Sequence, residues 1–384
     1  MESIRTDSLT DLMTVETEGQ EIMASREHEV LLALLRAGLW EREPENLSCF
    51  PLSDESWENV FRLARQQTVT GLIFVGLQYL ADRFSPPETL LIRWAAEADA
   101  IERKNRKMNM ALEELYALFR KKGLEPVLQK GQGVARFYAR PWARECGDID
   151  FYFPDCRAWE TACACLRLGN IETKKQADRG ISYRWKGVDV EHHRQLLDLY
   201  NPFLQGFANR LERQKGYQFI TLSAVSKAGV TVPSSFLELL LLNLHILKHA
   251  LGRGVGLRQL CDMARACHQL HEEVDSQEMK TVCQRLGLAE WSPLLHAFLV
   301  DSLGLPIGCL PYQETASTAQ PLNDIIWRGG NFGHYDAGLE RKADGWQRKW
   351  HTARSFNRNI RFACHYAPKE AAWLFIQLVK GQCK

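Results

Sequence analysis

Apolar residues recur at helical spacing through the first part of the chain. Residues 1–21 are mostly polar and are expected to be loosely ordered. From Arg26 onward apolar side chains fall on one helical stripe, and the same spacing returns in residues 51–80 and 88–121. These segments together predict an all-helical N-terminal region over residues 22–122.

The middle of the chain changes to short apolar runs separated by turn residues. These runs predict strands at residues 126–129, 148–153, 181–185 and 188–193, with helices at 132–139 and 159–168. Lys186-Gly187 lies between the last two strands and predicts a tight hairpin turn. Residues 123–232 are therefore predicted to form a core with a small mixed sheet, so the fold class is α+β.

Helical spacing returns after Pro233, and residues 233–384 are predicted to form a C-terminal helical domain. Ser235 and Glu238 have the spacing of a capping box ahead of a strongly apolar helix. Residues 234–300 are predicted to be helical, with a break at Gly252, Gly254 and Gly256. No strand precedes these glycines, so a dinucleotide-binding fingerprint is not predicted.

The tail from Glu340 onward mixes basic and aromatic residues. They are Arg341, Lys342, Arg348, Lys349, Arg354, Arg358 and Arg361, interleaved with Trp346, Trp350 and Phe356. Such a mixture is typical of nucleic-acid binding, of an acidic membrane surface, or of a terminal helix whose arginine stems cover apolar surface. The interpretation adopted is packing of the tail on its own domain.

Composition narrows the functional classes. Hydrophobic residues make up 45% of the chain and charged residues 25%, as in ordinary globular proteins. The formal net charge of +1 excludes a global field that recruits nucleic acid. The 11 cysteines form no Cys-x-x-Cys pair, and residues 236–247 are too short an apolar run to span a bilayer. A cytoplasmic protein with reduced thiols and no transmembrane segment is expected.

Two aspartates at strand spacing carry the candidate chemistry. Asp148 and Asp150 alternate with Ile149, Phe151 and Phe153, so both carboxylates point to one face of the predicted strand while the apolar side chains enter the core. Adjacent carboxylates repel each other unless a cation lies between them. Hard divalent cations with oxygen ligands fit such a pair, Mg²⁺ above all.

The residues around these aspartates resemble a known family. Leu128-Gln129-Lys130-Gly131, Tyr138, Arg144 and Gly147-Asp148-Ile149-Asp150 are similar to the pattern of a bacterial family described as uncharacterised nucleotidyltransferases, in the polymerase-β superfamily. Much of that superfamily has Gly-Ser after the first strand, where this chain has Gly131-Gln132. The resemblance implies a nucleotidyltransferase core over residues 123–232, flanked by helical regions.

The resemblance also implies an activity. A nucleoside monophosphate would pass from a nucleoside triphosphate such as ATP to an acceptor hydroxyl, and pyrophosphate would leave. Asp148 and Asp150 would hold two Mg²⁺ (or Mn²⁺) ions roughly 3.5–4 Å apart. The third carboxylate is expected at Glu191, in an acidic-x-His pattern that ends at His193, with Asp189 as the alternative.

Further residues are expected to contact the substrate. Lys130, Gly131, Gln132 and Gly133 would hold the phosphates, because glycine permits close approach of the backbone. The other expected contacts are Arg144, Gly147, His193 and Arg258. Arg144 is also suited to pairing with Glu145 or another surface acid, and an i,i+4 pair between Arg258 and Asp262 would brace the turn after Gly256.

Other classes of function stay open at this stage. The same fold without turnover would be a nucleotide-binding or protein-interaction module, and a third hypothesis is an enzyme that extends RNA. His245 and His249 lack the glutamate of a zinc-protease motif and are expected to pack at a domain interface. The acceptor (small molecule, sugar, protein or RNA), the base and the oligomeric state do not follow from the sequence.

Overall fold

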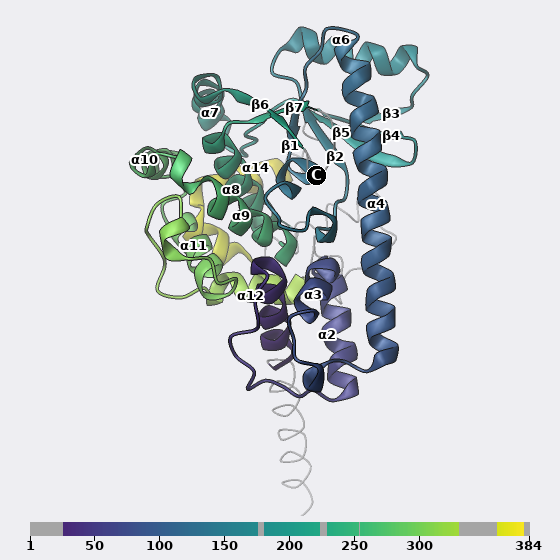
Figure 1. The fold of residues 1–384 in the computed structure, drawn as a ribbon. Helices are drawn as coiled ribbons and strands as arrows, with labels where there is room; N and C mark the ends of the chain where they lie inside the picture. The colour runs from purple at the N-terminus through teal and green to yellow at the C-terminus, as the bar shows by residue number, and fades with distance from the viewer. Residues whose placement is uncertain (1–25, 176–179, 223–228, 253, 330–358, 380–384) are drawn as a thin grey trace, which may run out of the picture. The chain divides into compact units, whose positions relative to one another are not determined.

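The computed structural model divides the chain into two compact units, residues 1–99 and residues 100–384 (Figure 1). It describes residues 26–175, 180–222, 229–252, 254–329 and 359–379. The expected loose segment 1–21 and nearly all of the basic and aromatic tail, including Trp346 and Trp350, lie outside the described residues. The domain boundaries expected from the sequence stay predictions.

The first unit is helical, as its hydrophobic spacing predicts. A helix at residues 26–40 is followed by α2 (Asp54–Gln66), α3 (Thr70–Leu77), the 3₁₀ turn η1 (Asp82–Phe84) and the start of α4 (Glu88–Arg120). The Ser53 side chain caps α2 by accepting a hydrogen bond from the Ser56 amide at 3.2 Å.

Two glycines permit unusually close helix packing in this unit. A Cβ atom at Gly38 would lie 1.9 Å from the carbonyl oxygen of Leu72, and one at Gly76 would lie 2.0 Å from the carbonyl oxygen of Leu34. Real Cβ atoms do not approach backbone oxygens so closely. The helix at 26–40 and α3 therefore pack backbone to backbone through these two positions.

The second unit is built on a seven-stranded mixed sheet with the order β3-β4-β5-β2-β1-β7-β6. The strands are β1 (Val127–Gln129), β2 (Ile149–Tyr152), β3 (Thr173–Lys175), β4 (Ile181–Trp185), β5 (Val188–His193), β6 (Tyr217–Thr221) and β7 (Gly229–Pro233). β1 is antiparallel to β2 and parallel to β7, and β2 is parallel to β5. The α+β class is confirmed.

The predicted hairpin is present with the predicted bounds. β4 and β5 pair antiparallel from Trp185↔Val188 to Ile181↔His192. The turn residues Lys186 and Gly187 have φ values of 49° and 78°. Both residues are thus left-handed, as in the type I′ turn whose twist matches that of the two strands.

The sheet has helices on both faces (Figure 1). α4 and α6 (Cys156–Leu168) cover one face, where Phe151 meets Tyr116 and Phe119 edge-on at centroid distances of 5.4 and 5.7 Å. This core also contains Leu128, Ile149, Phe153, Val190 and Val232. The short helix α5 (Gly131–Ala135) and α8 (Ser235–Leu251) belong to the opposite face.

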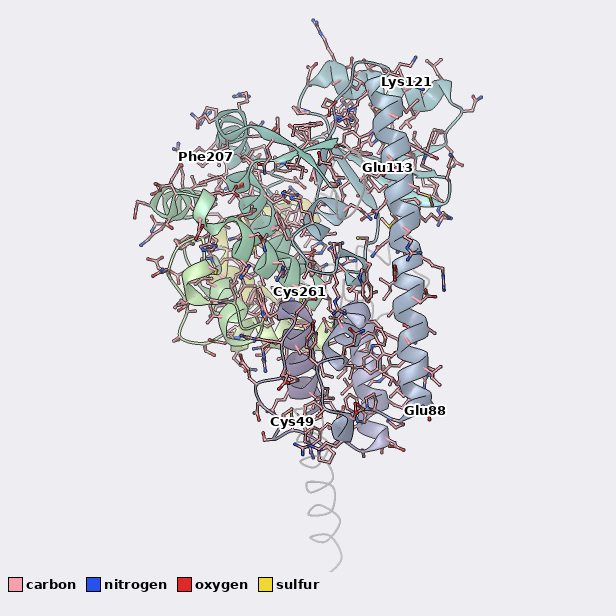
Figure 2. All side chains as sticks on the ribbon, in the orientation of Figure 1. Cys49, Glu88, Glu113, Lys121, Phe207 and Cys261 are labelled. Atoms are coloured by element: carbon pink, nitrogen blue, oxygen red, sulfur yellow. The ribbon has the colours of Figure 1, made fainter. Side chains whose placement is uncertain are left out.

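The C-terminal helices follow the sheet, and the predicted helical stretch 234–300 is confirmed with its break. They are α7 (Pro202–Lys215), which precedes β6, then α8, α9 (Leu257–Leu270), η3 (His271–Glu273), α10 (Ser276–Leu286), α11 (Trp291–Asp301), η4 (Ile307–Cys309), α12 (Gln320–Gly329), a helix at residues 359–366, and α14 (Pro368–Val379). α9 is well buried, and Cys261 on it is fully enclosed (Figure 2).

The predicted capping box at the start of α8 is wrong. Ser234, one residue earlier, is the N-cap and makes no side-chain cap bond. Ser235 donates its hydroxyl to the Glu273 carboxylate instead, and Glu238 lies buried 3.5 Å from Arg136. Tertiary contacts with η3 and with Arg136 thus replace the local reciprocal bonds that the spacing suggested.

The cysteines that the structure describes are free thiols. Burial raises the pKa of the Cys283 thiol to about 11. Among the helices of the described residues, none has the length and apolarity needed to cross a membrane.

His296 gives the fold a predicted acid sensitivity. It is fully buried on α11, its Nδ1 lies 2.8 Å from the Glu314 carbonyl oxygen, and burial lowers its pKa from 6.5 to about 4. Between these two pH values the His296 imidazole binds a proton in the unfolded chain but not in the folded chain. Protonation therefore favours the unfolded chain, and the free energy of unfolding falls by on the order of 3 kcal/mol as the pH is lowered from 6.5 towards 4.

The measurement is urea unfolding of wild type and His296→Asn at pH 7.5 and pH 5. The asparagine amide preserves a donor to Glu314 but has no titratable group. Wild type is expected to lose more stability than the variant between the two pH values. Equal losses would show that His296 does not carry the acid sensitivity.

Candidate active site

A row of polar side chains crosses the face of the sheet opposite α4. β2 and β5 are parallel and in register, so Asp150 lies beside Glu191. On the other side of β2, Gln129 on β1 lies directly opposite Asp150. Cross-strand partners point to the same face. Three neighbouring strands therefore present Gln129, Asp150 and Glu191 side by side.

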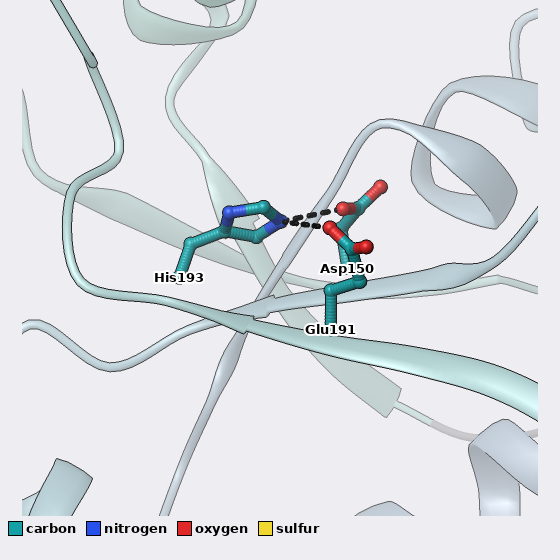
Figure 3. A group of neighbouring side chains, drawn as sticks. All are labelled: Asp150, Glu191 and His193. Atoms are coloured by element: carbon teal, nitrogen blue, oxygen red, sulfur yellow. Dashed lines mark hydrogen bonds and ion pairs between the residues drawn. The ribbon is translucent and has the colours of Figure 1, made fainter. Parts of the chain in front are cut away.

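Asp150, Glu191 and His193 form the compact centre of this row (Figure 3). His193 Nε2 lies 2.6 Å from Asp150 Oδ1 and 3.6 Å from Glu191 Oε2. One ligand atom from each residue lies within 4.8 Å of the other two, and no other group of three among the described residues meets this criterion. The Glu191 side chain is 28% exposed and the Asp150 side chain 6%, so the centre opens to solvent at Glu191.

Lys130 adds an internal cation at the end of β1. Its Nζ lies 3.3 Å from Asp150 Oδ1. Burial by itself would lower the pKa of Lys130, but the charges of Asp150, Asp148 and Glu191 outweigh it and raise the pKa above its ordinary value. The backbone at Lys130 has φ 45°, a left-handed conformation that costs a non-glycine residue on the order of 1–3 kcal/mol. The turn after β1 thus directs a charged ammonium at the carboxylates.

The two aspartates differ sharply in protonation. Burial, followed by the charge of Asp150, raises the pKa of Asp148 to about 7, although Lys130 opposes this shift. Burial would also raise the pKa of Asp150, but Lys130 and His193 outweigh it and hold that pKa below its ordinary value. At neutral pH Asp150 is therefore the permanent anion of the pair.

The ligand set differs from the one that the sequence suggested. Asp148, Asp150 and Glu191 were expected to hold metal, whereas the three ligand atoms that the structure groups belong to Asp150, Glu191 and His193. Asp148 lies just before β2, near enough for the charges of Asp150 and Glu191 to raise its pKa. The alternative Asp189 is 60% exposed and pairs with Arg184 at 2.9 Å.

Close backbone contact shapes the turn from β1 into α5. A Cβ atom at Gly131 would lie 3.2 Å from the Asp148 carbonyl oxygen, and Gly131 has φ +38°. Gly133 lies on α5 against Leu128. Gln132 is 1% exposed, and neither atom of its carboxamide has a hydrogen-bond partner among the described residues. Gly131 therefore lets the turn lie directly on the segment that carries Asp148.

Gly131→Ala is expected to destabilise the protein because it adds a clash to an unfavourable φ. Gly123→Ala is the matched control, since Gly123 also has a positive φ (+69°) but has open space around its Cβ position. The Gly131 variant should lose about 1 kcal/mol more unfolding free energy than the control. Chemical denaturation of both variants measures this difference, and equal losses would contradict the close contact.

Arg144, which was expected to contact the substrate, is bound to a carboxylate of the protein itself. Its Nε and Nη2 donate to the two oxygens of Asp262 at 2.7 and 2.6 Å, and both residues are 4% exposed. Tyr138 donates its hydroxyl to Asp262 Oδ1 at 2.7 Å. Arg144 therefore pairs with a buried acid that is distant in the sequence, rather than with Glu145 or another surface acid. The pair between Arg258 and Asp262 stays a prediction.

Arg258 on α9 contacts the segment that precedes β2, close to Gly147. Arg258 Nη1 donates to the Glu145 carbonyl oxygen at 3.1 Å, and a Cβ atom at Gly147 would lie 3.9 Å from that nitrogen. The segment that leads into β2 is therefore attached to α9 by both Arg144 and Arg258. This attachment positions the backbone from which Asp148 and Asp150 project.

One buried residue on β1 also belongs to the site. Gln129 was not among the expected site residues, but it is buried and its Nε2 has no hydrogen-bond partner among the described residues. Its position immediately before Lys130 is the sequence signal that could have identified it.

His245 and His249 on α8 pack edge to face at a centroid distance of 4.5 Å. Burial and then the charge of Lys130 lower the pKa of His245 well below its ordinary value.

The donor set suits a divalent metal ion. Two carboxylates and one imidazole nitrogen converge from adjacent strands, and their ligand atoms are close enough to share one ion. Lys130 shows that a positive charge is already stabilised at Asp150. Asp150, Glu191 and His193 therefore fit the divalent metal ion that a nucleotidyltransferase site implies.

Fold and site together define a chain with a mixed sheet, a strand–turn–helix at Lys130-Gly131 and an acidic centre on the neighbouring strands. A family model described as uncharacterised nucleotidyltransferase matches residues 53–299. The chain belongs to this family. No curated protein and no solved structure matches this chain.

Proposed function

We propose that the chain is a metal-dependent nucleotidyltransferase that uses a nucleoside triphosphate. The acceptor hydroxyl oxygen forms a bond to the α-phosphorus, the bond from that phosphorus to the bridging oxygen breaks, and pyrophosphate leaves. The hydroxyl proton passes to a base or to solvent. The observation that carries the proposal is the convergence of Lys130, Asp150 and Glu191 on one sheet face in a chain of this family.

Each side chain has a role that follows from its position. A divalent ion held by Asp150, Glu191 and His193 would neutralise phosphate oxygens and lower the pKa of the acceptor hydroxyl. Lys130 would exchange its contact with Asp150 for one with a phosphate oxygen, because both partners are anionic. Gln129 has an amide donor without a partner beside Asp150 and would donate to the same phosphate group. The expected role of Asp148 is to add a third carboxylate near the ion.

The acceptor would approach from the side of Glu191. The Glu191 side chain is 28% exposed, whereas Asp150, beside it on the neighbouring strand, is 6% exposed. Lys130 contacts Asp150 from the β1 side and Glu191 lies on the β5 side, so the triphosphate would lie towards Lys130 and the acceptor towards Glu191. Such a separation is what in-line displacement requires.

The test uses purified chain, Mg²⁺ or Mn²⁺, and an extract of cells that express the chain, with each nucleoside triphosphate labelled in turn. Transfer of α-labelled phosphate to a macromolecule or metabolite, with no transfer from γ-labelled triphosphate, would support the proposal. Binding of the triphosphate without any transfer would overturn it in favour of a non-catalytic nucleotide-binding module.

A further inference from the structure

The ligand centre combines nitrogen and oxygen donors, and this mixture restricts the ion. Mg²⁺ and Ca²⁺ bind oxygen ligands, and Mg²⁺ retains several of its waters. Imidazole nitrogen favours first-row transition ions, whose affinities for a given site rise through most of the series. A site in which one of three protein ligands is an imidazole therefore discriminates between these two groups of ions.

The position of His193 makes its nitrogen part of the centre. His193 follows Glu191 by two residues on β5, so both side chains lie on one face of the sheet. Nε2, the nitrogen at the far end of the ring, is the atom directed at Asp150 and Glu191. The side chain is 14% exposed, so its ring is held within the site.

A second observation points to a missing ligand at this place. Gln129 is 2% exposed, lies opposite Asp150 on the same face, and has a buried Nε2 without a hydrogen-bond partner among the described residues. A buried donor without a hydrogen-bond partner destabilises the folded chain, so a polar ligand beside it is favoured. A metal-bound water or phosphate oxygen beside Asp150 would satisfy that donor.

We infer that the centre selects a first-row transition ion such as Mn²⁺ over Mg²⁺ and Ca²⁺, and that His193 Nε2 is the ligand that sets this preference. The inference rests on the proposed function for the presence of the ion and deepens it by naming the class of ion. His193 would then do more than help to hold an ion, because its nitrogen would decide which class of ion binds.

The first test is spectroscopic and needs no variant. Electron spin echo envelope modulation of Mn²⁺ bound to the full chain, without nucleotide, detects directly coordinated ¹⁴N. Imidazole modulation is expected in wild type, and its absence from bound Mn²⁺ would overturn the inference. His193→Gln should remove the modulation, whereas His365→Gln, at an exposed position on the helix at 359–366, should keep it.

The second test measures selectivity by competition. Free Mn²⁺ is followed by electron paramagnetic resonance while Mg²⁺ or Ca²⁺ is added to wild type, His193→Asp and His365→Gln. Loss of an outer-shell partner lowers metal affinity 10–100-fold, and loss of a direct ligand should lower the Mn²⁺ affinity at least as much. The new carboxylate oxygen is a ligand that Mg²⁺ accepts, so the Mn²⁺ over Mg²⁺ preference should fall at least about tenfold. An unchanged preference in His193→Asp would overturn the inference.

Neither test depends on turnover, so the two proposals fail separately. A ¹⁴N signal without label transfer would leave the ion class in place and reject nucleotidyl transfer. Label transfer with only oxygen ligands on Mn²⁺ would support the reaction and reject the role of His193.

Discussion

Asp150→Asn is expected to lower nucleotidyl transfer about 1,000-fold, equivalent to about 4 kcal/mol of transition-state stabilisation. The reason is that one oxygen of Asp150 contacts both His193 Nε2 at 2.6 Å and Lys130 Nζ at 3.3 Å. The amide keeps the shape of the side chain but removes the charge around which the centre is organised. Initial rates of α-label transfer measure the effect.

Asp189→Asn is the matched control for this substitution. Asp189 lies on β5 two residues before Glu191, but it is exposed and pairs with Arg184. Its rate should stay within about twofold of wild type, because exposed ion pairs contribute little. Circular dichroism at the assay temperature must show that both variants are folded. Equal rates for the two variants would remove Asp150 from the proposed centre.

Arg144→Met is expected to destabilise the protein by about 3–5 kcal/mol, because it leaves the buried Asp262 carboxylate without its cation. The Arg144–Asp262 pair is bidentate, and both side chains are nearly inaccessible. Arg184→Met removes a pair of similar length, 2.9 Å, from an exposed position and should cost about 0–1 kcal/mol. Urea unfolding of the two variants gives the comparison.

A rescue variant separates loss of the charge pair from loss of packing. Replacing Arg144, Asp262 and Tyr138 together by Met, Leu and Phe removes the charges and the hydroxyl that depends on them. Buried ion pairs exchanged for apolar residues of similar volume are often neutral in stability, so most of the loss should be recovered. A triple variant as unstable as Arg144→Met would show that the cost comes from packing.

Local patterns predicted the parts of this fold whose causes are local. The β4–β5 hairpin follows from alternation around Lys186-Gly187, and Asp148 and Asp150 follow from the same period of two. The Arg144–Asp262 pair joins residues 118 positions apart, so no spacing rule identifies it. β7 pairs parallel with β1 across about a hundred residues and lies between β1 and β6, and it was not among the strands predicted from the sequence.

The site residues show the same division. Glu191 was chosen from its position on a predicted strand, and the register of β2 with β5 brings it beside Asp150. The entry of His193 into the ligand set depends on how its ring is directed, which a strand pattern does not specify. Gln129 was not expected at the site but lies there with an unpaired amide donor, whereas Arg144 was expected there but is bound to Asp262. Burial and partner geometry decide which polar group faces the centre, and the sequence pattern does not specify either.

The ammonium of Lys130 has a consequence for how the protein is made and handled. Because a built-in cation already balances the Asp150 carboxylate, the sheet has no need of a metal to reach its final form. The chain should therefore fold during synthesis without a metal ion, in contrast to zinc fingers, which unfold when their metal is removed. Protein purified in a strong chelator should be folded and should bind the metal ion when the ion is added again.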